Sequence, residues 1–237
     1  MQPDLSRSIT KALTLGLFAD RLLSMSLFNV LKRGLDILVA ASALIVLCPF
    51  LVAIGLIMRL SSKGPAVFKQ ERAGKNGKPF VFYKFRTMRA DVDPFGPSPK
   101  LGDDPRLTKV GKFLREYSLD ELPQLLNILK GDMSVVGPRP LYLSQIPEWN
   151  DRQRERLRVK PGLTGLAQVS GRGRITKEEK LELDVKYVET ASFLRDVRIV
   201  LATITRVFGR KDIYEKRYSQ TEHTRGKNED QKSKCKV

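Results

Sequence analysis

Two adjacent carboxylates, Asp120 and Glu121, stand out in the segment SLDELPQLLNILKGDMSVVGPRP (118–140). Pro123 follows closely, and proline is well tolerated in a helix only within the first turn. The leucines at positions 122, 125, 126 and 129 have the spacing of one helix face. The pattern predicts a helix that begins near Asp120, with both carboxylates at its N-terminal end.

The acidic pair has two interpretations. The structural one is an N-cap followed by an acid, both of which stabilise the positive end of a helix. The chemical one starts from the tendency of a helix N-terminus to bind phosphate. One carboxylate there can attack a phosphorus atom while its neighbour helps to hold Mg²⁺ against the phosphate oxygens. The pair by itself leaves both interpretations open.

Cationic side chains suited to an anionic substrate occur in three other segments. Lys84 and Arg86, in YKFRTM, alternate onto one face of a predicted strand. Arg139, in GPRP, is held between two prolines, and Arg172 follows the glycine-rich segment PGLTGLAQVSGR. Each alone is an ordinary surface charge. Together with the acidic pair they suggest phosphoryl transfer.

Composition narrows the chemistry further. The 237-residue chain has a formal net charge of +17, which indicates an anionic partner such as acidic lipid, a phosphorylated substrate or nucleic acid. Its single histidine lies in a polar C-terminal segment and its two cysteines are far apart. This argues against Ser-His and Cys-His nucleophiles, His-bound zinc and a disulfide framework. Carboxylates, Arg, Lys and a metal ion remain.

An uncharged apolar run at 37–58 predicts a membrane helix of roughly 33 Å. Cys48 and Pro49 lie at its middle, where proline removes a helix hydrogen bond and bends the axis. Lys32 and Arg33 precede the run and basic residues also follow it, which favours both ends on the cytoplasmic side. A re-entrant hairpin and a kinked spanning helix are equally compatible with these residues. Asp36 is placed at the interface, in a charge network that anchors the start of the helix.

The remaining sequence predicts a mixed fold. AVFKQ (66–70) and PFVFYKFRTM (79–88) have the composition of two strands joined by a turn. Helical patterns dominate from about residue 151. The segment SFLRDVRIVLATITRVFGR (192–210) is an amphipathic helix with arginines off its apolar stripe; it suits an anionic bilayer surface or, equally, a protein core.

The quoted segments resemble the bacterial sugar transferases, the small monotopic polyprenyl-phosphate phosphoglycosyl transferases. The similarity extends over about residues 30–208 and includes LKRGLDILVA, SLDELPQ…NILKGDMSVVGPRP and VKPGLTGLAQVSGR. Two departures stand out: Cys48 precedes Pro49 where the family usually has serine, and Gly173 follows Arg172 where asparagine is common. They bear on how firmly the helix break is held and on sugar selection.

The resemblance implies an α+β fold: an N-terminal re-entrant (helix-break-helix) membrane helix, then a mostly helical cytoplasmic catalytic domain with a small β-hairpin or sheet and interfacial amphipathic helices. The expected organisation is an N-terminal extension (1–27), the re-entrant membrane helix (28–60), the phosphoglycosyl transferase domain (61–208) and a basic, disordered tail (209–237).

The resemblance also implies a reaction and its participants. A sugar-1-phosphate passes from a UDP-sugar to undecaprenyl phosphate at the cytoplasmic face of the bacterial inner membrane, among membrane lipids, with UMP as the second product. Asp120 would be the nucleophile and Glu121 would help to bind Mg²⁺. Phosphate and nucleotide contacts would be Lys84, Arg86, Arg139 and Arg172. Lys32 and Arg33 would lie at the headgroups; a homodimer is an open alternative for the assembly.

A rival interpretation is a membrane-tethered nucleic-acid-binding protein, based on the basic charge and the aromatic-basic segment FVFYKF. No helix-turn-helix, zinc module or stacking platform is recognisable in the sequence. The expectation is therefore an enzyme without a nucleic-acid partner.

Overall fold

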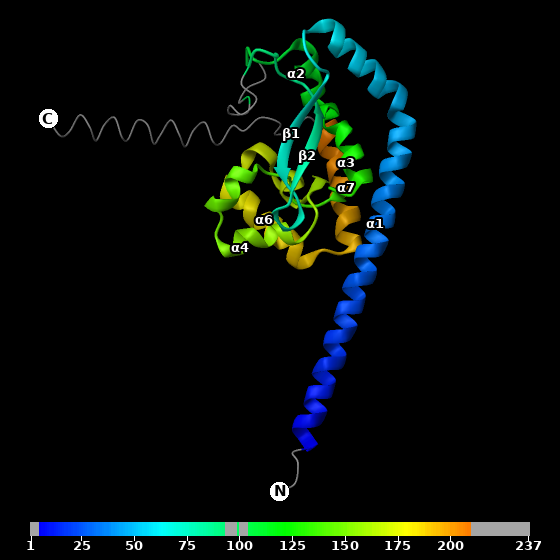
Figure 1. The fold of residues 1–237 in the computed structure, drawn as a ribbon, viewed down its shortest axis with the longest axis vertical. Coiled ribbons are helices and arrows are strands. Elements are labelled where there is room, and N and C mark those ends of the chain that lie inside the picture. The colour runs from blue at the N-terminus through cyan, green and yellow to red at the C-terminus, as the bar shows by residue number, and fades with distance from the viewer. Residues whose placement is uncertain (1–4, 93–98, 100–103, 210–237) are drawn as a thin grey trace, which may run out of the picture.

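The fold begins with one long helix, α1 (Leu5–Ser61), which continues through Pro49. The computed structural model describes residues 5–92, 99 and 104–209, and their side chains from residue 27 onward, those of Arg172 and Phe208 excepted. α1 bends in its C-terminal third, which contains Pro49 (Figure 1). The predicted break at Cys48 and Pro49 is therefore a bend within a continuous helix, and the predicted boundary between residues 27 and 28 lies inside α1.

The predicted pair of strands is confirmed as an antiparallel hairpin. β1 (Val67–Ala73) pairs with β2 (Pro79–Phe85), so that Gln70 lies opposite Phe82. A short turn, η1 (Lys75–Gly77), joins them. Phe80 and Phe82 are buried on one face of β2, and Lys84 follows them on that face. The hairpin thus brings a cation to the end of an apolar face.

The acidic pair lies in a 3₁₀ turn, η2 (Leu119–Gln124), which leads into α3 (Leu125–Lys130). The predicted helix is therefore divided: a 3₁₀ segment begins at Leu119, and the α-helix begins only at Leu125. Gly131 ends it in a left-handed conformation (φ 94°). Asn127 of α3 is fully buried; its amide nitrogen donates to the Val81 carbonyl at 2.7 Å and its oxygen accepts from the Tyr83 amide at 3.1 Å. A single side chain thus replaces a neighbouring strand at the open edge of β2 and fixes α3 beside the hairpin.

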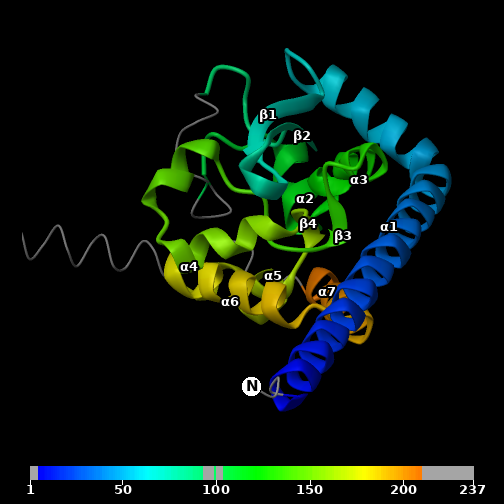
Figure 2. The same ribbon diagram turned by 60° about the horizontal axis from the view of Figure 1, so that its bottom comes forward.

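A second, parallel sheet, which the sequence did not predict, joins β3 (Ser134–Val136) to β4 (Gly162–Thr164). A Cβ at Gly137 or Gly162 would collide with the backbone of the other segment, so this approach requires glycine at both positions. The other elements surround these two sheets (Figure 2). They are α2 (Lys109–Glu116), η3 (Leu143–Glu148), α4 (Asp151–Arg154), η4 (Glu155–Arg158), α5 (Leu166–Ser170), η5 (Arg172–Arg174), α6 (Lys177–Thr190) and α7 (Phe193–Phe208).

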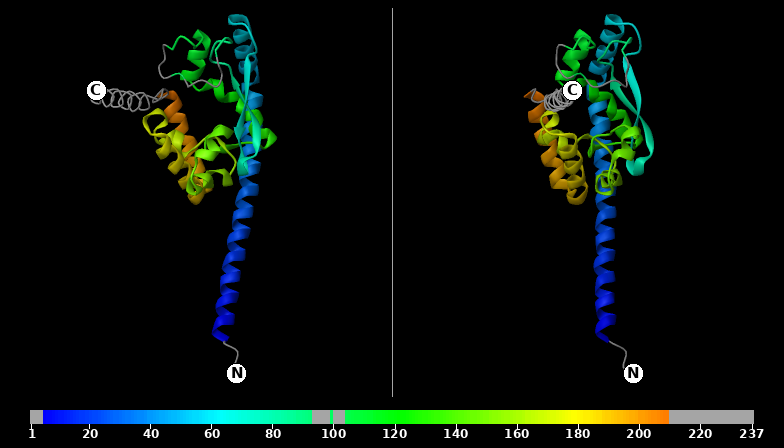
Figure 3. Two further views of the ribbon diagram at one scale, coloured as in Figure 1. Left: turned by 60° about the vertical axis from the view of Figure 1, so that its left-hand side comes forward. Right: turned by 90° about the vertical axis from the view of Figure 1, so that its left-hand side faces the viewer.

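The domain that follows α1 packs along the side of this helix rather than beyond its end, as both views of Figure 3 show. Ala40 of α1 packs with Phe80, Phe82 and residues of α3. Further along, Ile54 and Met58 pack with Phe85 and Leu114. α1 thus contributes to two apolar clusters of the domain, and burial of a large side chain such as Ile54 or Met58 is worth about 1.5–3 kcal/mol. Its opposite face remains apolar and exposed, with Ile45 and Val46 about three-quarters accessible.

Three charged residues at the beginning of the apolar run attach α1 to the domain. Lys32 forms an ion pair with Asp196 of α7 at 2.5 Å. Arg33 donates to the Ile128 and Leu129 carbonyls at the end of α3, at 2.5 and 2.9 Å. These partners are protein groups, and only Lys32 pairs with a charged one; the interfacial charge network stays a prediction. Contact of Lys32 and Arg33 with lipid headgroups stays a prediction.

Asp36 makes the most buried of these attachments. Its carboxylate accepts hydrogen bonds from the Val135 amide at 2.9 Å and the Ser134 hydroxyl at 3.1 Å, and the residue is only 5% exposed. We predict that Asp36→Ala leaves two buried donors unpaired, at a cost of about 1–3 kcal/mol. For a chain of this size, the melting temperature in detergent micelles should fall by roughly 3–10 °C.

The matched control is Val46→Ala on the exposed face of the same helix. It removes apolar atoms without unpairing a polar group, so its melting temperature should stay close to that of the parent protein. Equal melting temperatures for the two variants would contradict the attachment role of Asp36.

Candidate functional site

Asp120 is almost buried at the start of η2, with 5% of its surface exposed. Ser118, two residues before Asp120, has a left-handed conformation (φ 57°), which turns the chain sharply into η2. Within the described part of the chain no hydrogen bond holds the Asp120 carboxylate. Because no such hydrogen bond occupies them, the oxygen lone pairs of this buried carboxylate remain available to attack an electrophile or to bind a cation.

The neighbouring carboxylate is held by an arginine from a distant segment. Arg139 donates from both terminal nitrogens to the two oxygens of Glu121, at 2.6 and 3.2 Å. This forked geometry is the strong form of an arginine–carboxylate pair. The Arg139 side chain is nearly half exposed, so it is also accessible to a ligand. The structure thus brings together two of the regions that the sequence singled out.

Lys84 reaches the same place from β2. Its ammonium group lies 5.5 Å from the Phe68 ring centroid, and it interacts electrostatically with Asp120 and Glu121. Burial lowers the pKa of Lys84 to about 8, although the two carboxylates act in the opposite direction. Lys84 is therefore a partly desolvated cation next to the acidic pair.

The electrostatics of Asp120 depend mainly on its burial. Burial raises the pKa of the Asp120 carboxyl to about 6, and the adjacent Glu121 charge raises it as well. Lys84, Arg115 and Arg139 act against this increase. The carboxyl group is consequently charged above about pH 6, where it is a competent nucleophile.

Arg139 is positioned from behind by a buried ion pair. Arg156 donates to the Arg139 carbonyl at 2.6 Å and to Asp184 at 2.7 and 3.1 Å. The Arg156 guanidinium also lies 4.9 Å from the Trp149 ring centroid. Together with the flanking prolines, these contacts fix the backbone from which the Arg139 side chain extends. Neither Arg156 nor Asp184 was predicted from sequence; both lie in segments that read as ordinary helix.

Two predicted substrate contacts are placed differently. β2 ends at Phe85, so Arg86 leaves the strand face; it donates to the Lys63 carbonyl at 2.6 Å and to the Ser62 hydroxyl at 2.7 Å. These contacts make Arg86 an anchor between β2 and the end of α1. Arg172 begins η5, but its side chain lies outside the described residues. The phosphate roles of both residues stay predictions.

Two arginines near the site were missed by the sequence analysis. Arg115 of α2 interacts electrostatically with Asp120 and Lys84, and one of its terminal nitrogens is buried without a hydrogen-bond partner. Arg72 of β1 lies 3.5 Å from the Tyr142 ring centroid and interacts with Glu121 and Arg139. For Arg115 the available signal was its place five positions before Asp120, in FLREYSLDE.

The site fits a magnesium–phosphate complex rather than a protein-only metal cage. Among the described residues no group of three or more His, Cys, Asp or Glu side chains is placed to hold a metal ion. Mg²⁺ commonly uses one or two carboxylates and completes its shell with water and substrate phosphates. Asp120 and Glu121 supply that number of carboxylates, and Lys84 and Arg139 supply charge for a phosphate.

Comparisons with known proteins identify the family of this chain. The sequence model of the family described as bacterial sugar transferase matches residues 27–210. The chain is 43% identical to the sugar transferase EpsL of Bacillus subtilis over 197 residues, 83% of this chain and 96% of the relative. It is 45% identical over 186 residues to the UDP-glucose:undecaprenyl-phosphate glucose-1-phosphate transferase of Caulobacter vibrioides, covering 73% of this chain and 68% of the relative. The Escherichia coli protein of the same name is 41% identical, but the match spans 42% of its length.

The electrostatic account of the acidic pair predicts a measurable titration. In the metal-free protein, the pKa of Asp120 should be about 6. Glu121→Gln should lower it, because the variant removes a like charge, but burial should keep it above the ordinary value. Carbon-13 NMR of labelled aspartate carboxyls reports this pKa directly. Glu155→Gln, in an exposed pair with Arg158, is the control and should leave it unchanged. An unchanged or higher pKa in Glu121→Gln would contradict the account.

Proposed function

This chain belongs to the bacterial sugar transferase family, and from that premise we propose that it transfers a sugar-1-phosphate from a UDP-sugar to undecaprenyl phosphate. The family relationship makes it an enzyme of the phosphoglycosyl transferase type. Relatives named for UDP-glucose and undecaprenyl phosphate support the proposed donor and acceptor classes. The proposed role is the first membrane step in making a bacterial glycan. The observation that carries the proposal is the nearly buried Asp120 beside the Glu121–Arg139 pair.

The proposed reaction has two in-line displacements at one phosphorus atom. An Asp120 oxygen attacks the β-phosphorus of the UDP-sugar, the bond from that phosphorus to the bridging oxygen breaks, and UMP leaves with the electron pair. An oxygen of undecaprenyl phosphate then attacks the aspartyl phospho-sugar. The bond from phosphorus to the Asp120 oxygen breaks and regenerates the carboxylate. The products are undecaprenyl-diphosphate-sugar and UMP.

The surrounding residues have distinct proposed roles. Arg139 and Lys84 stabilise charge on the phosphates as the first bond breaks. Glu121 would help to hold Mg²⁺, which when bound neutralises phosphate charge. Glu121 pairs with Arg139 and would also bind Mg²⁺. Binding of the donor with its metal is therefore expected to loosen the Glu121–Arg139 pair. Arg172 and Arg86 retain a proposed contact with the phosphates or nucleotide.

We further propose that α1 enters only one leaflet and that the domain lies on the cytoplasmic face of the inner membrane. Among the described residues, one helix segment, Leu27–Ser61, is long and apolar enough to cross a bilayer. However, the hairpin packs beside that segment and carries Lys69, Glu71 and Arg72. A helix perpendicular to the membrane would draw these charges into hydrocarbon, at a cost of several kcal/mol. Shallow insertion of the exposed face of α1 avoids this cost and supports the single-leaflet proposal.

The rival function, a membrane-tethered nucleic-acid-binding protein, gains no support from the family match. The cations that surround Asp120 and Glu121 are accounted for by phosphate chemistry. The basic C-terminal segment 210–237, on which the rival partly depended, lies outside the described residues.

The function is tested with the purified full-length protein, undecaprenyl phosphate, Mg²⁺ and a panel of UDP-sugars. We expect UMP release with at least one donor, and none above background with Asp120→Asn, since an amide is a far weaker nucleophile than a carboxylate. Removal of Mg²⁺ with a chelator should also stop release. The assay separates donors by sugar, which the residues of the site do not specify.

Asp151→Asn, an exposed acid at the start of α4, is the matched control and should retain full activity. UMP release by Asp120→Asn at a rate near that of the parent protein would exclude Asp120 as the nucleophile. Failure of the parent protein with every UDP-sugar would contradict the proposed donor class.

A further inference from the structure

An open groove with a volume of about 390 Å³ lies between α5, α6 and α7, in a part of the domain that the proposed reaction does not use. Apolar side chains form most of its lining, among them Leu166 and Val169 of α5, Leu183 of α6 and Ile199 of α7. The volume is within the range of sites that bind small organic ligands. Its apolar walls indicate that the occupant has a hydrocarbon part.

Three cations also line this groove: Lys186 of α6 and Arg195 and Arg198 of α7. Arg195 donates to the Thr190 hydroxyl. In the described part of the chain, the Lys186 and Arg198 side chains form no hydrogen bond or ion pair. Both are exposed. The groove is therefore provided with positive charge that no ion pair among the described residues neutralises.

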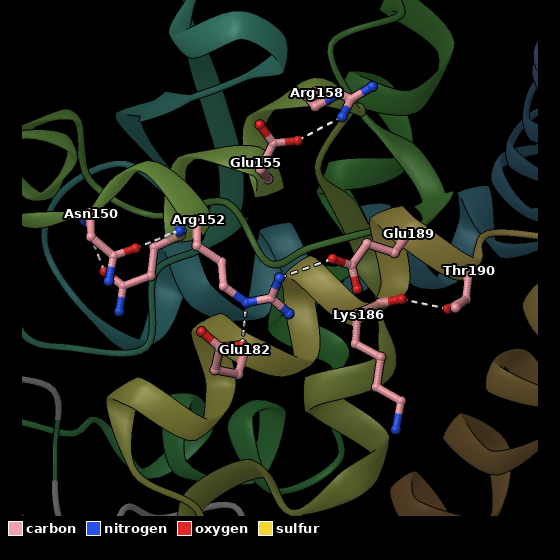
Figure 4. Close-up of polar contacts among 9 residues, drawn as sticks. Asn150, Arg152, Glu155, Arg158, Glu182, Lys186, Glu189 and Thr190 are labelled. Carbon is pink, nitrogen blue, oxygen red and sulfur yellow. Dashed lines mark hydrogen bonds and ion pairs between the residues drawn. The ribbon is translucent and has the colours of Figure 1, made fainter.

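Two acidic residues of α6 lie four residues before and three residues after Lys186, on the same helix face, and both are engaged by another cation. Arg152 pairs with Glu182 and Glu189, each at 3.0 Å. Figure 4 shows these two pairs and the Lys186 side chain extending away from them. No acidic side chain of the described residues lines the groove. Among the described residues, the groove therefore holds no anion of its own for these cations.

The groove adjoins an exposed apolar stripe on α7. The stripe comprises Phe193, Leu194, Val197, Leu201 and Ile204, each between 38% and 59% exposed. Arg198 lies at its border. On one side, three and four residues away, are Leu201 and Leu194 of the stripe; on the other side are Arg195 and Ala202, which line the groove.

A helix with this arrangement suits the surface of an anionic bilayer. The same helix is attached to α1, because Asp196 binds Lys32 at the beginning of the apolar run. The stripe and the groove therefore occur on an element that is tied to the proposed membrane helix.

We propose that this groove binds an anionic phospholipid of the surrounding bilayer. The headgroup phosphate binds Lys186 and Arg198, and the first part of an acyl chain lies along Leu183, Val169 and Leu166. A soluble phosphate would satisfy the cations but leave the apolar walls in water, whereas a zwitterionic lipid would not neutralise the charge. An anionic lipid meets both requirements and would hold α7 at the membrane surface.

The test is native mass spectrometry of the full-length protein in micelles that contain equal amounts of phosphatidylglycerol and phosphatidylcholine. All variants are expected to retain some lipid through α1. The measured quantity is therefore the ratio of retained phosphatidylglycerol to retained phosphatidylcholine. The parent protein should prefer phosphatidylglycerol. The double variant Lys186→Glu with Arg198→Glu should reduce that preference at least about tenfold, because each basic residue near an anionic surface contributes on the order of 1 kcal/mol.

Two further variants separate charge from shape. The double variant Lys75→Glu with Lys78→Glu, at two exposed lysines in and just after η1, makes the same charge change away from the groove and should keep the preference. Ala202→Phe fills the groove without changing charge and should reduce the retention of phosphatidylglycerol relative to phosphatidylcholine. Equal retention of both lipids by the parent protein, or the parent preference in the double variant, would overturn the proposal. So would displacement of the lipid by soluble glycerol phosphate at the same concentration. UMP release in the assay above does not depend on these outcomes.

Discussion

The attachment of α1 to the catalytic domain is the contact on which the rest of the structure depends. Arg33 binds the carbonyls at the end of α3, and η2 before α3 carries Asp120 and Glu121. Asp36 binds the backbone of β3, four residues before Arg139. One short segment of α1 therefore holds both halves of the acidic–basic site. Because the exposed face of the same helix is apolar, its depth in a bilayer would also set the height of the nucleophile relative to a lipid phosphate. This is a physical reason for a membrane enzyme to use a helix that is packed against its domain instead of a flexible tether.

The site combines burial with compensating charge. An isolated carboxylate in so buried a position would favour its neutral form, and a second carboxylate beside it increases that tendency. Lys84, Arg115 and Arg139 offset part of the effect, so Asp120 remains ionised near neutral pH. The cations thus support the proposed mechanism in two ways: they favour the charged form of Asp120, the proposed nucleophile, and they are placed to bind the phosphates of a donor. The cations of this site contribute to the net charge of +17, as do the exposed Lys186 and Arg198 of the groove.

Local patterns predicted the parts of the fold that depend on neighbouring residues. The apolar run, the β1–β2 hairpin, the helix that contains Leu125 and the stop at Gly131 were all predicted from sequence and are present. The β3–β4 sheet was missed because each strand has only three residues and its partner is distant in the chain. Arg86 matched the alternation of β2 by sequence, but the strand ends one residue earlier and the side chain is used to anchor α1. The Arg156–Asp184 pair was missed for a related reason, since a buried ion pair between distant segments has no periodic signal.

The proposed two-step mechanism requires that Asp120 carry the phospho-sugar as a covalent adduct, and intact-mass spectrometry tests this most directly. The protein is mixed with a UDP-sugar that it turns over and with Mg²⁺, in the absence of undecaprenyl phosphate, and quenched in acid. The mechanism predicts a mass increase equal to one sugar phosphate, which peptide mapping should locate at Asp120. This increase should disappear when undecaprenyl phosphate is added before the quench. Formation of the lipid-linked product with no adduct at any time, or an adduct at another residue, would contradict the mechanism.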